Sequence, residues 1–227
     1  WWYSSVCTKE NDLDMDEETI IIDTNTRNER IKNFLINNKK NFIAGISILL
    51  IALVGYFALQ EIKERNKIKL ADQFNEVITN FKESEKQKTI NELKNIINNS
   101  DVTYSPLALY FLVDNNLINN NEINELFDEL INEINLEKEI RHLIIYKKAL
   151  FNSNFATEND LIQILNPIIN SESIWKSHAL YLMAEYFYSK KQNQKAKEFF
   201  KQILTLPNSN GDIKVESQKR LNRDLGE

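Results

Sequence analysis

The stretch LYLMAEYFYSKKQNQKAKEFFKQILTLP, residues 180–207, contains the spacing that decides the predicted fold. Ala184 is followed by Ala196 twelve residues later and by Phe200 sixteen residues later. Small residues at Ala184 and Ala196 allow two antiparallel helices to approach closely, and Phe200 can fill the space beside a neighbouring pair. Pro207 lies where it would stop the second helix. The stretch therefore predicts a pair of antiparallel helices that packs against similar pairs.

Large residues equivalent to Phe200 recur upstream at Leu93, Phe127 and Leu165, so that successive members of the series are 34, 38 and 35 residues apart. A period of about 34 residues is that of the tetratricopeptide repeat, a helix–turn–helix unit, and this spacing resembles it. Pro167 departs from the pattern, because it should end or kink the second helix of the third unit. Coincidence in a helical protein is the alternative. The residues expected to pack four degenerate repeats are Leu93, Phe127, Leu165, Ala184, Ala196 and Phe200.

The composition agrees with a helical protein and excludes several other classes. None of the four glycines lies between Gly55 and Gly211, which excludes glycine-rich phosphate loops and a β fold with many tight turns. Asn-rich runs, such as residues 98–101, can replace Gly in turns between helices. One Cys and two His cannot build a disulfide framework or a three-His zinc site, and a net charge of −5 gives no general attraction to nucleic acid. We expect an all-α chain with no cofactor, metal, nucleic-acid partner or small-molecule substrate.

Residues 42–59, FIAGISILLIALVGYFAL, form an uncharged segment of 18 residues. A helix of this length just crosses a hydrocarbon core of about 30 Å. A buried core helix and a cleaved signal peptide are the alternatives, but Tyr56, Phe57 and Leu59 precede a charged run and leave no small-residue cleavage site. The segment predicts an uncleaved transmembrane helix. Five basic residues before it and four after it weakly favour a cytoplasmic N-terminus.

Two segments precede the predicted span. Met15 begins a charged stretch typical of a natural start, so residues 1–14, including Cys7, are expected to be an extension foreign to the native protein. A disordered tail is the alternative. Residues 15–41 predict a cytoplasmic segment in which Thr26–Asn38 forms a short amphipathic helix at the level of the lipid headgroups, or a partly ordered tail.

The predicted repeat domain covers residues 60–227 and ends in a capping helix around Gln218–Leu225. Repeat arrays bind along the surface that the first helix of each unit lines, and a mixture of tyrosine and polar groups there suits a peptide or protein. The expected lining residues are His178, Tyr181, Glu185, Tyr188 and Ser189 in the last unit, Tyr146, Leu150 and Asn154 in the third, and Ala108, Leu112, Asn115 and Asn116 in the second. Two alternatives stay open: Tyr181 and Tyr188 pack between repeats, or a terminal helix fills the groove.

No set of residues in the sequence resembles a catalytic site. His142 and His178 are expected to be half-buried helix residues, and Ser and Thr are scattered without a neighbouring base. We therefore predict a protein without enzymatic activity. A catalytic domain with an unrecognised site is the rival interpretation.

A charged segment with Arg27 and Arg30, one N-terminal span and a degenerate tetratricopeptide-like domain together resemble the ancillary SecYEG translocon subunit family, whose soluble domain is shared with cell-division coordinators. The resemblance covers about residues 18–225 and is most specific at Trp175–Phe200. It implies a single-pass protein of the bacterial inner membrane, with a cytoplasmic N-terminus and a periplasmic repeat domain. It further implies an adaptor whose partners are translocon subunits, a periplasmic chaperone or the emerging polypeptide. A scaffold for envelope-assembly or cell-division complexes is the alternative.

Overall fold

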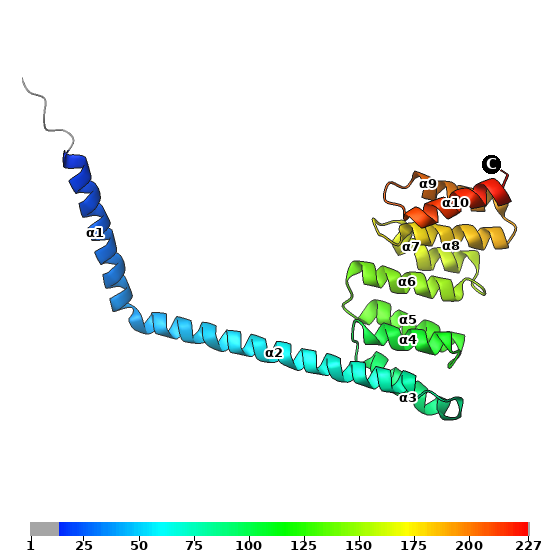
Figure 1. Cartoon of the computed structure of the whole chain (residues 1–227), viewed down its shortest axis with the longest axis horizontal. Coiled ribbons are helices and arrows are strands. Elements are labelled where there is room, and N and C mark those ends of the chain that lie inside the picture. Colours follow the sequence, from blue (N-terminus) through cyan, green and yellow to red (C-terminus); the bar gives the residue numbers. More distant parts are fainter. Residues whose placement is uncertain (1–13, 227) are drawn as a thin grey trace, which may run out of the picture. The chain divides into compact units, whose positions relative to one another are not determined.

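The computed structural model describes residues 14–226, and every regular element in that range is helical. The predicted all-α class is therefore confirmed for the described residues. The elements are α1 (Asp14–Asn37), α2 (Lys39–Thr79), a 3₁₀ turn (Glu83–Glu85), α3 (Lys86–Asn98), α4 (Tyr104–Asp114), α5 (Asn120–Glu133), α6 (Lys138–Asn152), α7 (Glu158–Ile169), α8 (Lys176–Ser189), α9 (Asn193–Thr205) and α10 (Gly211–Asp224) (Figure 1).

The chain divides into two compact units, with the boundary between Arg65 and Asn66. Residues 1–13, with Cys7, lie outside the described residues. The expected start at Met15 therefore stays a prediction.

A short break at Asn38 separates α1 from α2 in the first unit. The Asn38 side-chain amide donates to the Phe34 carbonyl at 3.0 Å, and the Asn38 carbonyl accepts from the Phe42 amide N–H at 3.0 Å. The rings of Phe34 and Phe42 meet edge to face, with their centroids 6.0 Å apart. The segment Thr26–Asn38, expected to be an amphipathic helix, is helical from Thr26 to the end of α1.

Helix α2 carries the predicted transmembrane segment. It contains 41 residues, which at a rise of about 1.5 Å per residue gives a length of about 60 Å. Its apolar side chains are exposed, Ile51 and Leu59 among them. Within the described residues, α2 is the one helix long and apolar enough to cross a membrane, which agrees with the span predicted at residues 42–59. The helix continues to Thr79 because no Pro or Gly interrupts it after Gly55.

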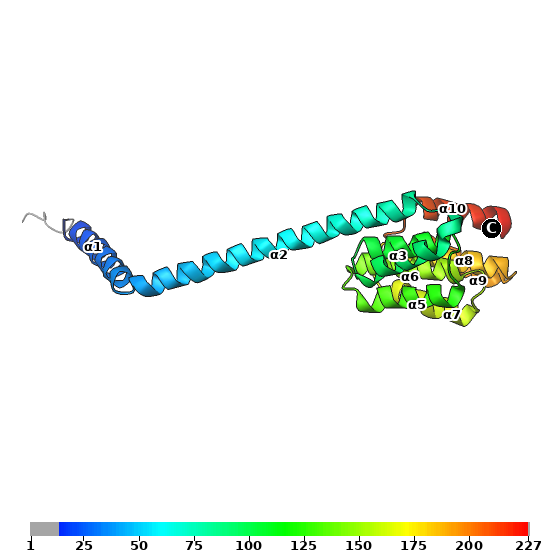
Figure 2. The same ribbon diagram turned by 90° about the horizontal axis from the view of Figure 1, so that it is seen from below.

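The second unit is a stack in which each helix from α3 to α10 packs against the next along the chain (Figure 1). Alternate helices also touch in its C-terminal half, where α6 contacts α8 and α8 contacts α10. Seen from below, α5 and α7 lie on the side of the stack opposite α10 (Figure 2). In the C-terminal half, α8 therefore packs between α6 and α10.

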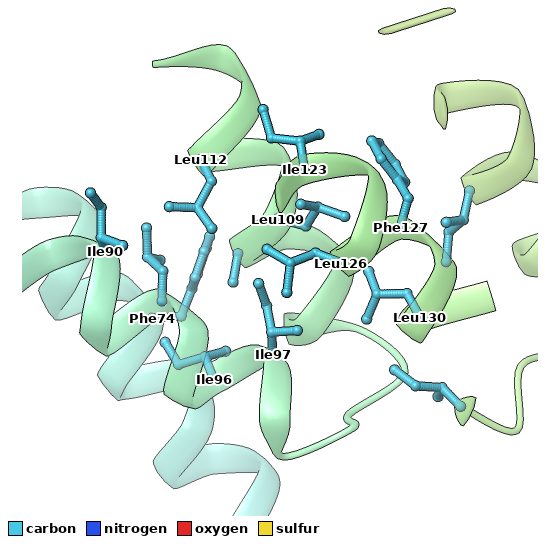
Figure 3. Close-up of a cluster of buried hydrophobic side chains, with 14 of the residues drawn as sticks. Phe74, Ile90, Ile96, Ile97, Leu109, Leu112, Ile123, Leu126, Phe127 and Leu130 are labelled. Atoms are coloured by element: carbon cyan, nitrogen blue, oxygen red, sulfur yellow. The ribbon is translucent and has the colours of Figure 1, made fainter. Parts of the chain in front are cut away.

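Two hydrophobic cores hold the second unit together. The first joins the end of α2 to α3, α4 and α5, and Figure 3 shows Phe74, Leu109 and Phe127 among its side chains. The second runs from α6 to α10 and contains Phe200. Helix α6 contributes to both cores, because Ile144 belongs to the first and the adjacent Ile145 to the second. At most 1% of the surface is exposed in each residue expected to pack the repeats: Leu93, Phe127, Leu165, Ala184, Ala196 and Phe200.

Asparagine starts and ends several of these helices, as the Asn-rich runs predict. The Asn119 side chain accepts the amide N–H of Glu122 at the start of α5, and Asn210 accepts two amide N–H groups at the start of α10. After α4, Asn116 adopts a left-handed conformation with φ of 51°, which Asn tolerates better than most residues. Pro167 lies inside the last turn of α7, which ends two residues later at Ile169. Side-chain caps and one left-handed Asn thus replace glycine in these turns.

Candidate binding groove

Helix α10 covers the face of α8 that was expected to line an open groove. The Glu185 carboxylate accepts two hydrogen bonds from Arg220 of α10, one of them 2.7 Å from Nε to Oε1. The same guanidinium lies 4.7 Å from the centroid of the Tyr188 ring. The prediction that Glu185 and Tyr188 line an open groove is therefore wrong, and the alternative of a terminal helix in the groove describes this end of the stack.

Tyr181 packs against a residue of the neighbouring helix. Its ring meets Phe200 of α9 edge to face, with the centroids 5.5 Å apart. Burial, and to a smaller extent the Glu185 carboxylate, raise the pKa of the Tyr181 hydroxyl to about 12. Tyr181 therefore stays neutral at physiological pH and contributes to packing between α8 and α9, the two helices of the last predicted pair. Packing between repeats stays a prediction for this residue.

Leu112 and Asn115 of α4 do not meet in a groove. Leu112 is fully buried in the first core, and Figure 3 shows it among the side chains of that cluster. Asn115 is exposed at the end of α4, and its side-chain amide donates to the Phe111 carbonyl at 2.9 Å. The sequence of α4, YSPLALYFLVD, is apolar around most of its circumference, so the expected helix face was misassigned for Leu112.

His178 and Tyr146 belong to an aromatic cluster between α6 and α8. Tyr146 stacks on Trp175 with centroids 5.9 Å apart, and His178 lies 5.1 Å from the same indole. Burial lowers the pKa of His178, and it does the same for His142 on α6. Both imidazoles are therefore neutral at pH 7, and the cluster joins two helices of the second core.

An open groove lies between α4 and α6, in the middle of the stack. Its volume is about 480 Å³, within the range of binding pockets in proteins. The lining residues are Tyr110, Val113, Asp114, Asn116, Asn120, Phe127, Lys147, Leu150, Phe151, Asn154 and Phe155. The predicted lining residues Asn116, Leu150 and Asn154 come together here, whereas Tyr110, Lys147 and Phe155 were not foreseen. Phe155 could have been noticed as an aromatic residue within an Asn-rich turn.

Exposed apolar side chains form one part of this groove. Leu150 is 42% exposed and Phe155 is 50% exposed. The Phe155 ring rests edge to face on Phe151 at 5.3 Å, and Phe151 in turn contacts Phe127 of the first core at 6.3 Å. The exposed Phe155 ring is thus supported by Phe151, which itself packs on the first core.

Polar groups complete the groove. The Tyr110 hydroxyl is buried and has no hydrogen-bond partner within the described part of the chain, and burial raises its pKa to about 12. Lys147 of α6 lies 5.5 Å from the centroid of the Tyr110 ring. Three side-chain amides, Asn116, Asn120 and Asn154, can each donate and accept a hydrogen bond. These groups could exchange hydrogen bonds with the amides of a bound chain.

Among residues 26–226, whose side chains are described, no group of His, Cys, Asp and Glu is arranged to hold a metal ion. Comparison of the chain with protein-family models, curated proteins and solved structures finds no match. The fold and the groove define an all-helical protein with one candidate membrane span and an open surface between α4 and α6.

Proposed function

We propose that this chain is a non-enzymatic, membrane-anchored adaptor that binds polypeptide in the groove between α4 and α6. The observation that carries the proposal is the pairing of exposed Leu150 and Phe155 with three side-chain amides around one hollow. Apolar side chains of a bound polypeptide would be removed from water by Leu150 and Phe155. Its backbone would exchange hydrogen bonds with the amides, because backbone N–H and C=O groups must be satisfied when they leave water.

The helical stack is proposed to be a degenerate tetratricopeptide-like array of four pairs: the end of α2 with α3, α4 with α5, α6 with α7, and α8 with α9. Support comes from Ala184 and Ala196, both fully buried where α8 and α9 pack closely, and from Phe200 beside them. In such an array, the groove lies between the first helices of the second and third pairs. That is where repeat arrays expose their binding surface.

We further propose that α2 crosses the bacterial inner membrane once, with the N-terminus in the cytoplasm and the helical stack in the periplasm. The exposed apolar surface of α2 supports the span, and the resemblance to the translocon accessory family supports the orientation. On this basis the occupant of the groove is a translocon subunit, a periplasmic chaperone or a polypeptide emerging from the translocon. The protein would then link secreted proteins to periplasmic chaperones.

Site-specific crosslinking in native membranes tests the proposal. A photo-reactive amino acid is placed at Phe155 in the groove and, as the matched control, at Ile174, which is similarly exposed outside it. We expect crosslinks to translocon components, chaperones or emerging chains from Phe155 and not from Ile174. Recovery of only division or envelope-assembly proteins would favour the scaffold alternative. The absence of any crosslink specific to Phe155 would refute binding in this groove.

The proposed orientation has a separate test. A reporter that is active only in the periplasm is fused after Glu227, and its activity is compared with that of a reporter active only in the cytoplasm. We expect the periplasmic reporter to be active. Activity of the cytoplasmic reporter alone would refute both the orientation and the proposed partners.

A further inference from the structure

The helical corner where α1 meets α2 combines positive charge with exposed apolar side chains. Between residues 26 and 41 it carries one carboxylate, Glu29, against five cationic side chains. The cations are Arg27, Arg30, Lys32, Lys39 and Lys40. This local excess of +4 contrasts with the net charge of −5 of the whole chain, so the corner has a ligand preference that the overall composition hides.

Over residues 26–37 of α1 the charges are ordered around the helix, except for Arg27, which shares the face of Ile31. Ile31, Phe34 and Leu35 are three and four residues apart and share one face, and all three are exposed. At about 100° per residue, Arg30 and Lys32 flank this face on its two sides, and Glu29 lies nearly opposite. An apolar face with basic flanks and the acidic group turned away is the arrangement of a helix that lies on an anionic membrane surface.

A hollow of about 440 Å³ occupies the inside of the corner. It is lined by Phe34 from α1, by Phe42, Ile46 and Leu49 from α2, and by the amides of Asn38 and Asn41. Gly45 borders open space in this hollow, because a Cβ atom placed on it would meet nothing within 4 Å. The hollow is continuous with the apolar surface of α2. A ligand that fills it must therefore have an apolar part, and it must also reach the polar surface beside Asn38.

We propose that this corner binds an anionic phospholipid of the bilayer. The acyl chains lie against Phe42, Ile46 and Leu49, and the phosphate group is paired with the basic side chains of α1 and of the first turn of α2. Clusters of Lys and Arg immediately beside a membrane span attract anionic lipids. The inference rests on the proposed membrane span, because α1 can lie on the bilayer surface only if α2 crosses the bilayer.

Native mass spectrometry of the full chain, with its bound lipids, tests this inference. The protein is reconstituted in nanodiscs of equal parts phosphatidylglycerol and phosphatidylcholine and released with its retained lipids. We expect the wild-type protein to retain phosphatidylglycerol over phosphatidylcholine by at least about fivefold. The variant R30Q/K32Q/K39Q/K40Q should lose this preference.

The chain offers a matched control on the other side of the apolar segment. The variant K63Q/R65Q/K67Q/K69Q removes the same number of cations after residue 59 and should keep the preference. No preference in the wild type, or an equal loss in both variants, would overturn the inference. Insertion is measured separately by flotation with vesicles in alkaline carbonate. A chain that does not float refutes the span itself, and an inserted chain without lipid preference refutes only the lipid site.

Discussion

In the helical stack, the surface between alternate helices is covered in the C-terminal half and open in the N-terminal half. Between α8 and α10 the surface is closed by Arg220, which binds Glu185 and Asp224 and covers Tyr188. Between α4 and α6 the corresponding surface is a groove in which Leu150 is exposed. Both halves have a fully buried core, so the difference arises at the surface and not from incomplete packing.

The comparison indicates where a partner can bind without unfolding part of the chain. At the C-terminal end, a partner would first have to displace α10 and the ion pairs of Arg220. In the groove, a partner meets Leu150 and Phe155, whose exposed apolar surface is already accessible. Removal of that surface from water favours binding. The open half is therefore the half in which we propose that a partner binds, and the closed half is expected to contribute mainly stability.

Truncation of the central phenylalanine of either core should have the largest effect. Phe127→Ala and Phe200→Ala each leave a cavity in a fully buried site and should lower the free energy of unfolding by about 3–5 kcal/mol. If the halves are partly independent, hydrogen exchange should rise in α3–α5 for Phe127→Ala and in α8–α10 for Phe200→Ala. Denaturant unfolding and hydrogen-exchange mass spectrometry measure the two effects. The same increase throughout the stack for both variants would show a single cooperative unit.

Loss of Arg220 should open the closed half alone. Its side chain is 18% exposed and binds two carboxylates, so Arg220→Ala should lower the free energy of unfolding by about 1–2 kcal/mol after allowance for solvent screening. Exchange in α10 should rise while exchange in α4 stays unchanged. Arg223→Ala is the control, because that side chain is exposed and should contribute little. An equal effect of the two variants would contradict the role given to Arg220.

The amide pair Asn124–Asn152 joins α5 to α6 and should contribute less. Asn124 and Asn152 exchange two hydrogen bonds of 3.1 and 2.7 Å, and Asn152 is buried. Either single change to Ala should cost about 1 kcal/mol, because it leaves a polar group of the other residue unpaired. The double variant should cost less than the sum of the two. Strict additivity in this double-mutant cycle would show that the pair is not coupled.

Mild acid should weaken the second core more than the first. The sequence contains two His, His142 on α6 and His178 on α8, and burial lowers the pKa of both. A lowered pKa in the folded state means that stability is complete above the ordinary value of 6.5 and is lost as the pH falls below it. Between pH 7.5 and 5, exchange should rise in α6 and α8 more than in α3–α5. His178→Phe, which keeps a ring beside Trp175, should reduce this pH dependence.

Local patterns predict much of the architecture. The spacing of Ala184, Ala196 and Phe200 depends on residues close together in the chain, and all three are buried where α8 and α9 pack. The uncharged run at residues 42–59 is equally local, because its 18 residues are consecutive in the chain. A helix that is apolar on every face cannot be accommodated easily in a small soluble protein. The Asn-rich runs mark helix ends for the same reason, since capping involves only the adjacent turn.

The closed face was harder to predict because it depends on distant polar residues. Arg220 and Glu185 are 35 residues apart, and in sequence each looks like an ordinary solvent-facing charge. Leu112 was predicted on the wrong face of α4. This helix is apolar around almost its whole circumference, so its sequence pattern does not indicate which face is buried. Phe155 was missed because it follows α6, outside the helices from which the groove was expected to be built.

Changes to the exposed apolar residues of the groove should have the smallest effect on stability and the largest effect on binding. The double variant Leu150→Asp with Phe155→Ser replaces two exposed side chains and should change the free energy of unfolding by at most about 0.5 kcal/mol for each. Crosslinking from a photo-reactive residue at Asn154, which lies between them, should nevertheless be lost, because the apolar surface of the groove is gone.

A matched pair of changes in the closed half separates binding from general surface effects. Val215→Asp with Ile174→Ser also replaces two exposed apolar residues, one on α10 and one before α8, and should leave crosslinking from Asn154 intact. If both double variants abolish crosslinking, exposed apolar area in general recruits the partner and the two halves do not differ in binding. If only the groove variant does so, α4 and α6 provide the binding surface, and the closure of α8 by α10 directs partners to it.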